Sequence, residues 1–172
     1  MAGIYVHIPF CHSKCAYCDF YSMPLRNEAD FVDSLTNEYS SRKKELTEDV
    51  STIYLGGGTP SCLSRKQLTR IFELLPVDNT EEITIEINPE DATEDFIQWL
   101  HKSTPVNRIS MGVQSLNDNE LKTIGRRHSA IEAVEAANRL LDCGFNLSLD
   151  LIYGLPGQDT VSWKKSLEGI LN

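Results

Sequence analysis

The sequence has 172 residues, which is enough for one domain with a hydrophobic core. Its 16 basic and 25 acidic side chains give a formal net charge of −9, which argues against a nucleic-acid-binding protein. The first residues lack the basic start of a signal peptide, and no run approaches the roughly 20 apolar residues of a membrane span. We therefore expect a cytoplasmic protein without a transmembrane segment.

Apolar, β-branched runs alternate along the chain with longer amphipathic stretches. Strands are expected at residues 3–9, 51–55, 82–87, 107–112 and 145–152. Helices are expected at residues 27–45, 64–76, 93–101, 117–125, 129–143 and 162–171. This alternation predicts an α/β protein with a parallel sheet. It leaves open a doubly wound sheet and part of a barrel, because five βα units are too few for an eight-stranded barrel of about 250 residues.

Polar and glycine residues follow every predicted strand, where parallel α/β folds place their chemistry. In chain order these are the cysteine cluster at 11–18, the glycine loop at 56–60, Glu86 with Asn88 and Glu90, Gln114 with Ser115, and Asp150 with Tyr153. Five loops that bring unusual residues to one edge of the sheet predict a single site there.

Three of the five cysteines, Cys11, Cys15 and Cys18, fall in a C-x3-C-x2-C pattern. Thiolates crowded this closely suit zinc or an iron–sulfur cluster. A structural zinc site would need a fourth ligand, which His7 or His12 could supply. An electron-transfer ferredoxin would need a fourth cysteine. We favour a [4Fe–4S] cluster on three cysteines, which leaves one iron open for a bound cofactor, and zinc remains the alternative.

Four motifs resemble the radical S-adenosylmethionine (SAM) superfamily, and within it the oxygen-independent coproporphyrinogen III oxidase family and its heme-chaperone relatives. They are YVHIPFC at 5–11, LGGGTP at 55–60, MGVQS at 111–115 and DLIYGLP at 150–156. The resemblance implies most of a partial (β/α)6 barrel, ending after about five βα units. It also implies that residues 1–172 are the core domain from the N-terminal part of a longer protein.

The residue after the cluster separates two branches of that family. The resemblance implies that true oxidases carry another cysteine two residues after the third, and this chain has Phe20 there. We therefore expect a heme chaperone that delivers heme to an acceptor protein, with oxidative decarboxylation of coproporphyrinogen as the alternative. Implied partners are SAM, heme or a porphyrin, an acceptor protein and an electron donor. Whether the chain is an enzyme stays open, and no catalytic residue or heme ligand is assigned.

The resemblance also implies residues that hold SAM. Backbone groups of the glycine loop would bind its methionine part, and Glu86 would face inward to it, whereas a plain turn and a solvated glutamate are the alternatives. A guanidinium suits the SAM carboxylate, and Arg126 fits the family pattern better than Arg127, which is expected to be solvated. The full expected set is Tyr5, Tyr17, Gly57, Gly58, Thr59, Glu86, Gln114, Arg126 and Asp150.

The remaining histidines and cysteines receive no ligand role. His7 is expected to bond locally or to shape the cavity, and the other histidines are expected at the surface (His12, His101 and His128). Cys62 and Cys143 are isolated in the sequence and are expected to pack as small apolar residues.

Overall fold

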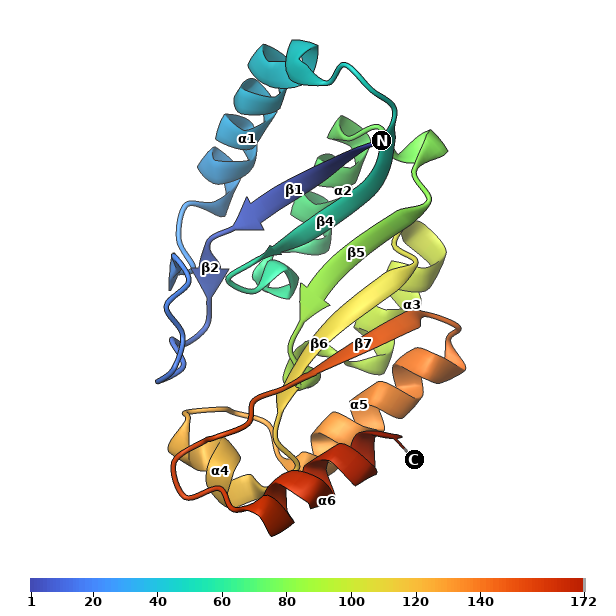
Figure 1. The fold of residues 1–172 in the computed structure, drawn as a ribbon. Helices are drawn as coiled ribbons and strands as arrows, with labels where there is room; N and C mark the ends of the chain where they lie inside the picture. The colour runs from blue at the N-terminus through green and yellow to red at the C-terminus, as the bar shows by residue number, and fades with distance from the viewer. Residues whose placement is uncertain (172) are drawn as a thin grey trace.

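Five parallel strands lie side by side in chain order in the computed structural model, which describes residues 1–171. They are β1 (Ala2–Ile8), β4 (Val50–Gly57), β5 (Glu82–Ile87), β6 (Arg108–Gln114) and β7 (Asn146–Leu151). Every neighbouring pair is parallel, as the alternation of elements predicts (Figure 1).

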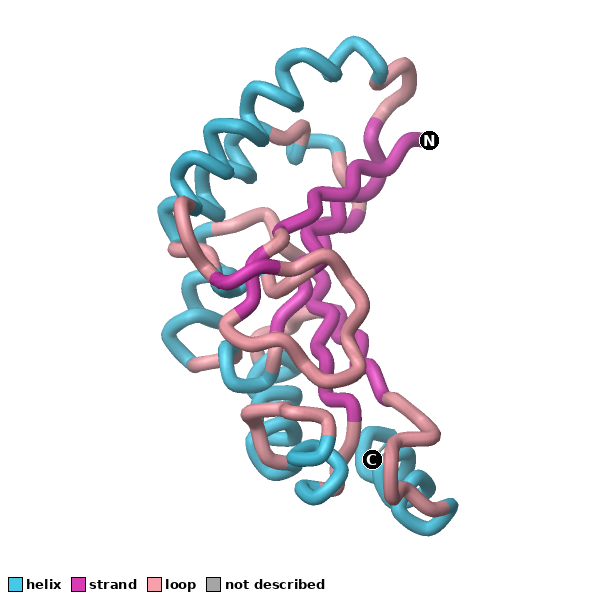
Figure 2. The backbone as a smooth tube through the Cα atoms, turned by 90° about the vertical axis from the view of Figure 1, so that its left-hand side faces the viewer, coloured by secondary structure: helices cyan, strands magenta, loops and turns pink. Residues whose placement is uncertain are grey.

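The helices decide between the two architectures that the residues leave open. They are α1 (Glu28–Arg42), α2 (Arg65–Leu74), α3 (Glu94–Ser103), α4 (Asp118–Thr123), α5 (Ala130–Asp142) and α6 (Thr160–Leu171). Figure 2 shows α1, α2, α3 and α5 on one side of the sheet, while the opposite face of β1, β4 and β5 carries none of the described helices. A doubly wound sheet would reverse its strand order and carry helices on both faces. The chain therefore forms part of a barrel.

The helix boundaries follow the capping signals in the sequence. Ser64 forms a capping box with Gln67 at the start of α2, and Thr93 accepts a hydrogen bond from the Phe96 N–H at the start of α3. Gly144 follows α5 with a positive φ of 86°, which is the usual way to end a helix. Short 3-10 turns complete the connections, at Lys43–Glu45, Pro60–Cys62, Val77–Asn79 and Pro89–Asp91. No helix among residues 1–171 has the length and apolar character needed to cross a bilayer.

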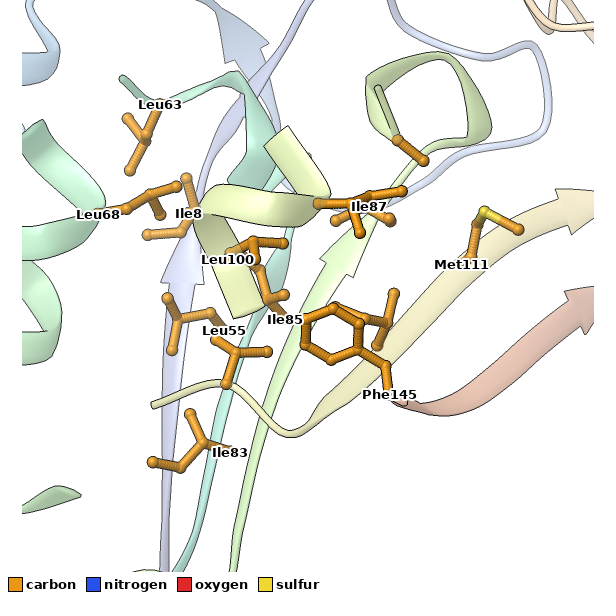
Figure 3. Packing of buried hydrophobic residues seen from close by; sticks show 14 of the residues in the cluster. Ile8, Leu55, Leu63, Leu68, Ile83, Ile85, Ile87, Leu100, Met111 and Phe145 are labelled. Carbon is orange, nitrogen blue, oxygen red and sulfur yellow. The ribbon is translucent and has the colours of Figure 1, made fainter. Parts of the chain in front are cut away.

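The core lies between the sheet and these helices. Ile8, Leu55 and Ile85 point from neighbouring strands toward Leu68 of α2 and Leu100 of α3, and all five side chains are fully buried (Figure 3). Burying each of them stabilises the fold by about 1.5–3 kcal/mol. Because side chains alternate along a strand, the residues between them point to the uncovered face. That inner face is largely polar, with Tyr54, Glu86, Ser110 and Asp150 among its residues.

A short parallel bridge closes the cysteine loop, and nothing in the periodicity of the sequence predicts it. β2 (Phe10–Cys11) pairs with β3 (Met23–Pro24), and the Met23 N–H donates to the Pro9 carbonyl at 2.7 Å. The two ends of the loop that carries the cysteines are therefore fixed to each other and to the end of β1.

Candidate cofactor site

A cavity of about 340 Å³ opens at the carboxyl ends of the strands, and loops after all five strands of the main sheet line it. Every residue expected to bind the cluster or SAM lines this cavity except Tyr5. These are Cys11, Cys15, Cys18, Tyr17, Gly57, Gly58, Thr59, Glu86, Gln114, Arg126 and Asp150. The structure thus brings together residues that lie up to 139 positions apart in the sequence (Cys11 to Asp150).

The three clustered thiols are free and half-buried, and two of them contact residues outside the loop. The Cys11 thiol lies 3.5 Å from the Thr59 hydroxyl, and the Arg126 guanidinium donates to the Cys15 sulfur at 3.7 Å. Among residues 1–171, no three His, Cys, Asp or Glu side chains converge to hold a single metal ion. Three soft thiols around one cavity suit a multinuclear iron–sulfur cluster.

Backbone hydrogen bonds hold the glycine loop against the end of β1 and the start of β2. The Gly58 N–H donates to the Ile8 carbonyl at 2.8 Å, and the Thr59 N–H donates to the Phe10 carbonyl at 2.7 Å. A Cβ on Gly58 would lie 2.5 Å from the Phe10 carbonyl oxygen, far inside contact distance. Close backbone approach therefore requires glycine here, and the loop is held against the cysteine segment as one wall of the cavity.

Glu86 points into the cavity, so the alternative of an outward, solvated glutamate is wrong. Its carboxylate accepts from the Tyr54 hydroxyl at 2.7 Å and from the Gly57 N–H at 3.0 Å. Burial raises the pKa of Glu86 despite these two donors. Burial, together with the bond to Glu86, also raises the pKa of Tyr54 to about 12. The carboxylate is an acceptor placed beside glycine backbone, which suits an ammonium group.

Arg126 lines the cavity, and one of its buried nitrogen atoms has no hydrogen-bond partner among residues 1–171. Its guanidinium donates to the Asn88 side-chain oxygen at 2.7 Å and to the Gly112 carbonyl at 2.6 Å. Its Nε is buried and has no hydrogen-bond partner. An unsatisfied buried donor costs about 1–3 kcal/mol, more when it is charged, so this N–H needs an acceptor from outside the protein, either an ordered water or a ligand. A carboxylate is the acceptor that a guanidinium matches best.

Three more residues line the cavity: Gln114, Asp150 and Tyr17. Gln114 has a φ of 69°, which is unusual for a residue other than glycine and typical of functional sites. Asp150 accepts from the Ser110 hydroxyl at 3.3 Å and keeps its second oxygen available on the open face. Burial raises the pKa of Tyr17 to about 12, against the opposing charge of Arg126, so the phenol is neutral at physiological pH.

Tyr5 lies outside the cavity. It is on the inner face of the sheet, 58% exposed, and its ring stacks on Tyr54 with centroids 6.0 Å apart. Its hydroxyl lies 3.2 Å from His7 Nδ1. Burial and then the charge of Glu86 raise the pKa of Tyr5, and its assignment as a SAM ligand stays a prediction.

The prediction that His128 lies at the surface is wrong. His128 is 4% exposed, and its two ring nitrogens lie 3.1 Å from the Val113 carbonyl and 3.2 Å from the Glu90 carboxylate. Arg127 is exposed as predicted, and it also pairs with Glu90 at 3.1 Å. His12 and His101 are exposed as predicted. Cys62 and Cys143 pack against the core as predicted, and burial raises the pKa of the Cys62 thiol to about 12.

Three residues to which the sequence analysis assigned no binding role support the site. Asn88 bridges the Arg126 guanidinium and the Thr59 hydroxyl, to which its amide donates at 3.2 Å. Tyr54 and Ser110 position the two inward carboxylates. Tyr54 and Ser110 share the inner strand face with those carboxylates, so the period-two pattern of the strands could have identified them.

Comparison with known proteins gives consistent matches. The family model described as "Radical SAM superfamily" matches residues 5–168. A protein named heme chaperone HemW from Lactococcus lactis is 42% identical over 174 residues, covering 97% of this chain and 45% of that protein. HemW from Escherichia coli is 39% identical over 166 residues, covering 91% and 43%. The chain thus spans less than half the length of these curated relatives.

One solved structure shares both fold and sequence. It is coproporphyrinogen III oxidase (HemN) from Escherichia coli, described in its title as a radical SAM enzyme. The TM-score is 0.86 at 32% identity, and the match covers 98% of this chain and 41% of that one. The likeness supports the partial-barrel architecture seen in the strand order.

Proposed function

We propose a function from one premise: this chain belongs to the radical SAM superfamily. Membership implies a [4Fe–4S] cluster and SAM. We assign the cluster to Cys11, Cys15 and Cys18, with the open iron facing SAM. The observation that carries the assignment is that the three free thiols line one cavity together with Glu86 and Arg126. When bound, the reduced cluster supplies the electron that cleaves SAM.

We propose one role for each part of SAM from the chemistry of the residues that line the cavity. The Glu86 carboxylate and the backbone of Gly57 and Gly58 receive the amino group, and Arg126 receives the carboxylate. Asp150 and Gln114 face the ribose side with oxygen and amide groups, and Tyr17 offers an aromatic face to adenine. These roles rest on the shared lining of one cavity and on the donor or acceptor character of each side chain.

At the level of the whole protein, we propose a cytoplasmic heme chaperone that passes heme to an acceptor protein, with an electron donor serving the cluster. Support comes from the relatives named heme chaperone, which are 42% and 39% identical to this chain. Phe20, which lines the cavity where the oxidase branch would place a cysteine, points the same way. The similarity to coproporphyrinogen III oxidase keeps oxidative decarboxylation of coproporphyrinogen as the second candidate.

Anaerobic reconstitution tests the cluster. Wild type should bind about four irons with matching sulfide. Cys15→Ala should lose most of both, whereas Cys143→Ala, which removes a thiol outside the cavity, should keep them. Iron content that is unchanged in Cys15→Ala would contradict the proposed ligand set.

Separate measurements test SAM binding, radical cleavage of SAM and the oxidase reaction. Arg126→Gln should weaken SAM binding about tenfold or more, because it removes a charge-assisted bond, while Arg139→Gln outside the cavity should not. With dithionite and SAM, release of 5′-deoxyadenosine would establish radical cleavage. Addition of coproporphyrinogen III should then give no protoporphyrinogen IX, and its formation would favour the oxidase role instead.

A further inference from the structure

Glu120 is a buried carboxylate to which the proposed cofactor function assigns no role. It lies on α4, is 3% exposed and stands outside the set of residues that line the cavity. Its Oε2 accepts from the Ser115 hydroxyl at 2.6 Å and from the Gln158 side-chain amide at 2.8 Å. Its Oε1 accepts from the Ser162 hydroxyl. These donors come from the loop after β6, the loop after β7 and the first turn of α6, so one side chain joins three segments (Figure 1).

The donors keep this carboxylate ionised although it is shielded from solvent. Burial alone would raise the pKa of Glu120, but the bonds from Ser115, Ser162 and Gln158 lower it. A buried charge that loses its donors is strongly unfavourable, so the carboxylate and its donors are held in one arrangement. We call these four side chains the Glu120 network.

The network fixes the backbone around Gln114. Ser115 is the next residue in the chain and is fully buried, and its oxygen also accepts from the Asn117 N–H at 3.0 Å. Gln114 has a φ of 69°, and a residue other than glycine keeps such a conformation only where its surroundings hold it. The bond from Ser115 to Glu120 therefore helps to hold Gln114 in the cavity wall.

The network also joins the loop after β7 to Gln114. The Gln158 side-chain oxygen accepts from the Gly154 N–H at 2.7 Å. The Gln158 side-chain nitrogen, which donates to Glu120, also donates to the Ile152 carbonyl at 3.4 Å. The Ile152 N–H donates in turn to the Gln114 carbonyl at 2.9 Å. Residues 152–158 are thus closed into a turn whose first residue is bonded to Gln114.

The network supports one part of the cofactor cavity. Gln114, Asp150 and Ile152 line the cavity at the ends of the paired strands β6 and β7, where we propose that the nucleoside half of SAM binds. The side chains proposed for the amino-acid half have other partners. Glu86 bonds to residues of β4, and Arg126 bonds to the loop after β5 and to the backbone of β6.

We propose that Glu120 is a positioning residue for the nucleoside half of SAM, on which it acts through Ser115 and Gln158. The inference rests on the proposed binding of SAM in this cavity. Because the network holds the wall in place before SAM arrives, it lowers the entropic cost of binding the ribose and the adenine. Loss of the network should therefore weaken ligands that contain the nucleoside and spare a ligand that contains only the amino acid.

Two substitutions at position 120 separate the hydrogen bonds from the volume of the side chain. Glu120→Leu keeps a side chain of similar size and removes every acceptor. Glu120→Gln keeps one oxygen, which can accept from Ser115 and Gln158 as Oε2 does, and gains a nitrogen that can donate to the Ser162 hydroxyl. Gln158→Ala breaks the same connection from a half-buried loop position. Val32→Ala, which shortens a buried side chain on α1, is the control for loss of stability alone.

Equilibrium dialysis of the cluster-loaded chain with SAM, 5′-deoxyadenosine and methionine tests the inference. Glu120→Leu and Gln158→Ala should each weaken binding of SAM and 5′-deoxyadenosine by about fivefold or more, and change methionine affinity by less than about twofold. Glu120→Gln and Val32→Ala should bind all three ligands as wild type does.

Hydrogen exchange without SAM provides a second readout. In Glu120→Leu, the amides of residues 114–117 and 152–158 should exchange about tenfold faster than in wild type, while those of β5 should not change. Equal exchange of these residues in both proteins would overturn the inference, because the network would then not hold the wall.

The ligand measurements distinguish positioning from a general loss of structure. Equal weakening of all three ligands in Glu120→Leu, or the same pattern of weakening in Val32→Ala, would overturn the inference. Unchanged affinities in Glu120→Leu and Gln158→Ala would overturn it while leaving SAM binding in place. A loss in Glu120→Gln equal to that in Glu120→Leu would overturn it too, because the effect would then follow charge and not these hydrogen bonds. Failure of wild type to bind SAM would overturn the cofactor function as well, so the two failures are distinguishable.

Discussion

At the scale of single residues, Glu90 joins the wall of the cavity to the segment that carries Arg126. It pairs with Arg127 at 3.1 Å and with buried His128 at 3.2 Å. Burial alone would raise the pKa of Glu90, but the bond from His128 and the charge of Arg126 lower it to about 2. The carboxylate is thus ionised wherever the protein is folded near neutral pH.

This depressed pKa predicts a loss of stability in acid. An unfolded glutamate titrates near pH 4.3, so the stabilisation is complete above that pH and is lost as pH falls toward 2. Between pH 7 and pH 3, the free energy of unfolding of wild type should fall by about 1–2 kcal/mol more than that of Glu90→Gln, after discounting for solvent screening. Urea unfolding at both pH values measures this change in the free energy of unfolding. Glu73→Gln, at an exposed helical position, should follow wild type. Parallel curves for Glu90→Gln and wild type would contradict the prediction.

Residue roles differ in how far the sequence could predict them. The cysteines and Glu86 stand out because their chemistry contrasts with the strand pattern around them. His128 follows two arginines, and nothing local shows that the chain after α4 passes under the end of β6, where the Val113 carbonyl accepts from the ring. The hydrogen bonds of Asn88 depend on partners 29 and 38 positions away, which no local pattern reveals.

At the scale of elements, the glycine loop after β4 is defined by close contact with the end of β1. Gly58 has no positive φ, so its need for glycine comes from the Phe10 and Ile8 carbonyl oxygens, which would lie 2.5 and 2.9 Å from a Cβ at this position. Gly157 is the opposite case, with a φ of 81° and open space around it. Substitutions at these two positions therefore distinguish the cost of steric overlap from the cost of backbone strain.

Gly58→Ala should therefore destabilise the protein by about 2–3 kcal/mol, because backbone cannot move aside as a side chain can. Gly157→Ala should cost about 1 kcal/mol, the strain of the left-handed conformation alone. Urea unfolding gives both values. Gly58→Ala should also lower iron content after reconstitution, since the loop contacts the Cys11 segment, whereas Gly157→Ala should not. Equal effects of the two changes on stability and iron would contradict the close-contact explanation.

The long elements were predictable because many residues share each pattern. Five strands and six helices follow from apolar periodicity, and Ser64 and Thr93 mark their helix starts. The bridge between Phe10 and Met23 was not predictable, because a two-residue pairing has no period. The sequence also left the architecture open, since the same alternation fits sheets with one or two helical layers. The single layer of helices and the strand order together decide between them (Figure 2).

At the scale of the whole molecule, stability is distributed unevenly. The strands β4, β5 and β6 are each paired on both sides and packed under helices. Between the bridge strands, the cysteine loop has few backbone bonds, among them Cys18 N–H to Cys15 and Ala16 N–H to Ile124. Local opening is easiest where backbone bonds and buried contacts are few.

Hydrogen exchange should show this gradient and its change on cofactor binding. In the cluster-free chain, amides of β5 should exchange slowest, and those of residues 12–22 should exchange within the shortest labelling times. Cluster loading should slow the loop by tenfold or more, about 1.4 kcal/mol, without changing β5. Mass spectrometry of labelled peptides measures both states. A loop that is already protected without the cluster would contradict the prediction.

The bridge between β2 and β3 closes the loop that holds the three clustered thiols. Cys11 belongs to the bridge itself, and the segment carrying Cys15 and Cys18 begins and ends at it. On the proposed ligand set, the three thiols would act as one tridentate chelator whose ring is closed by folding. The entropy of bringing its two ends together is lost when the sheet forms, so metal binding need only order the interior of the loop.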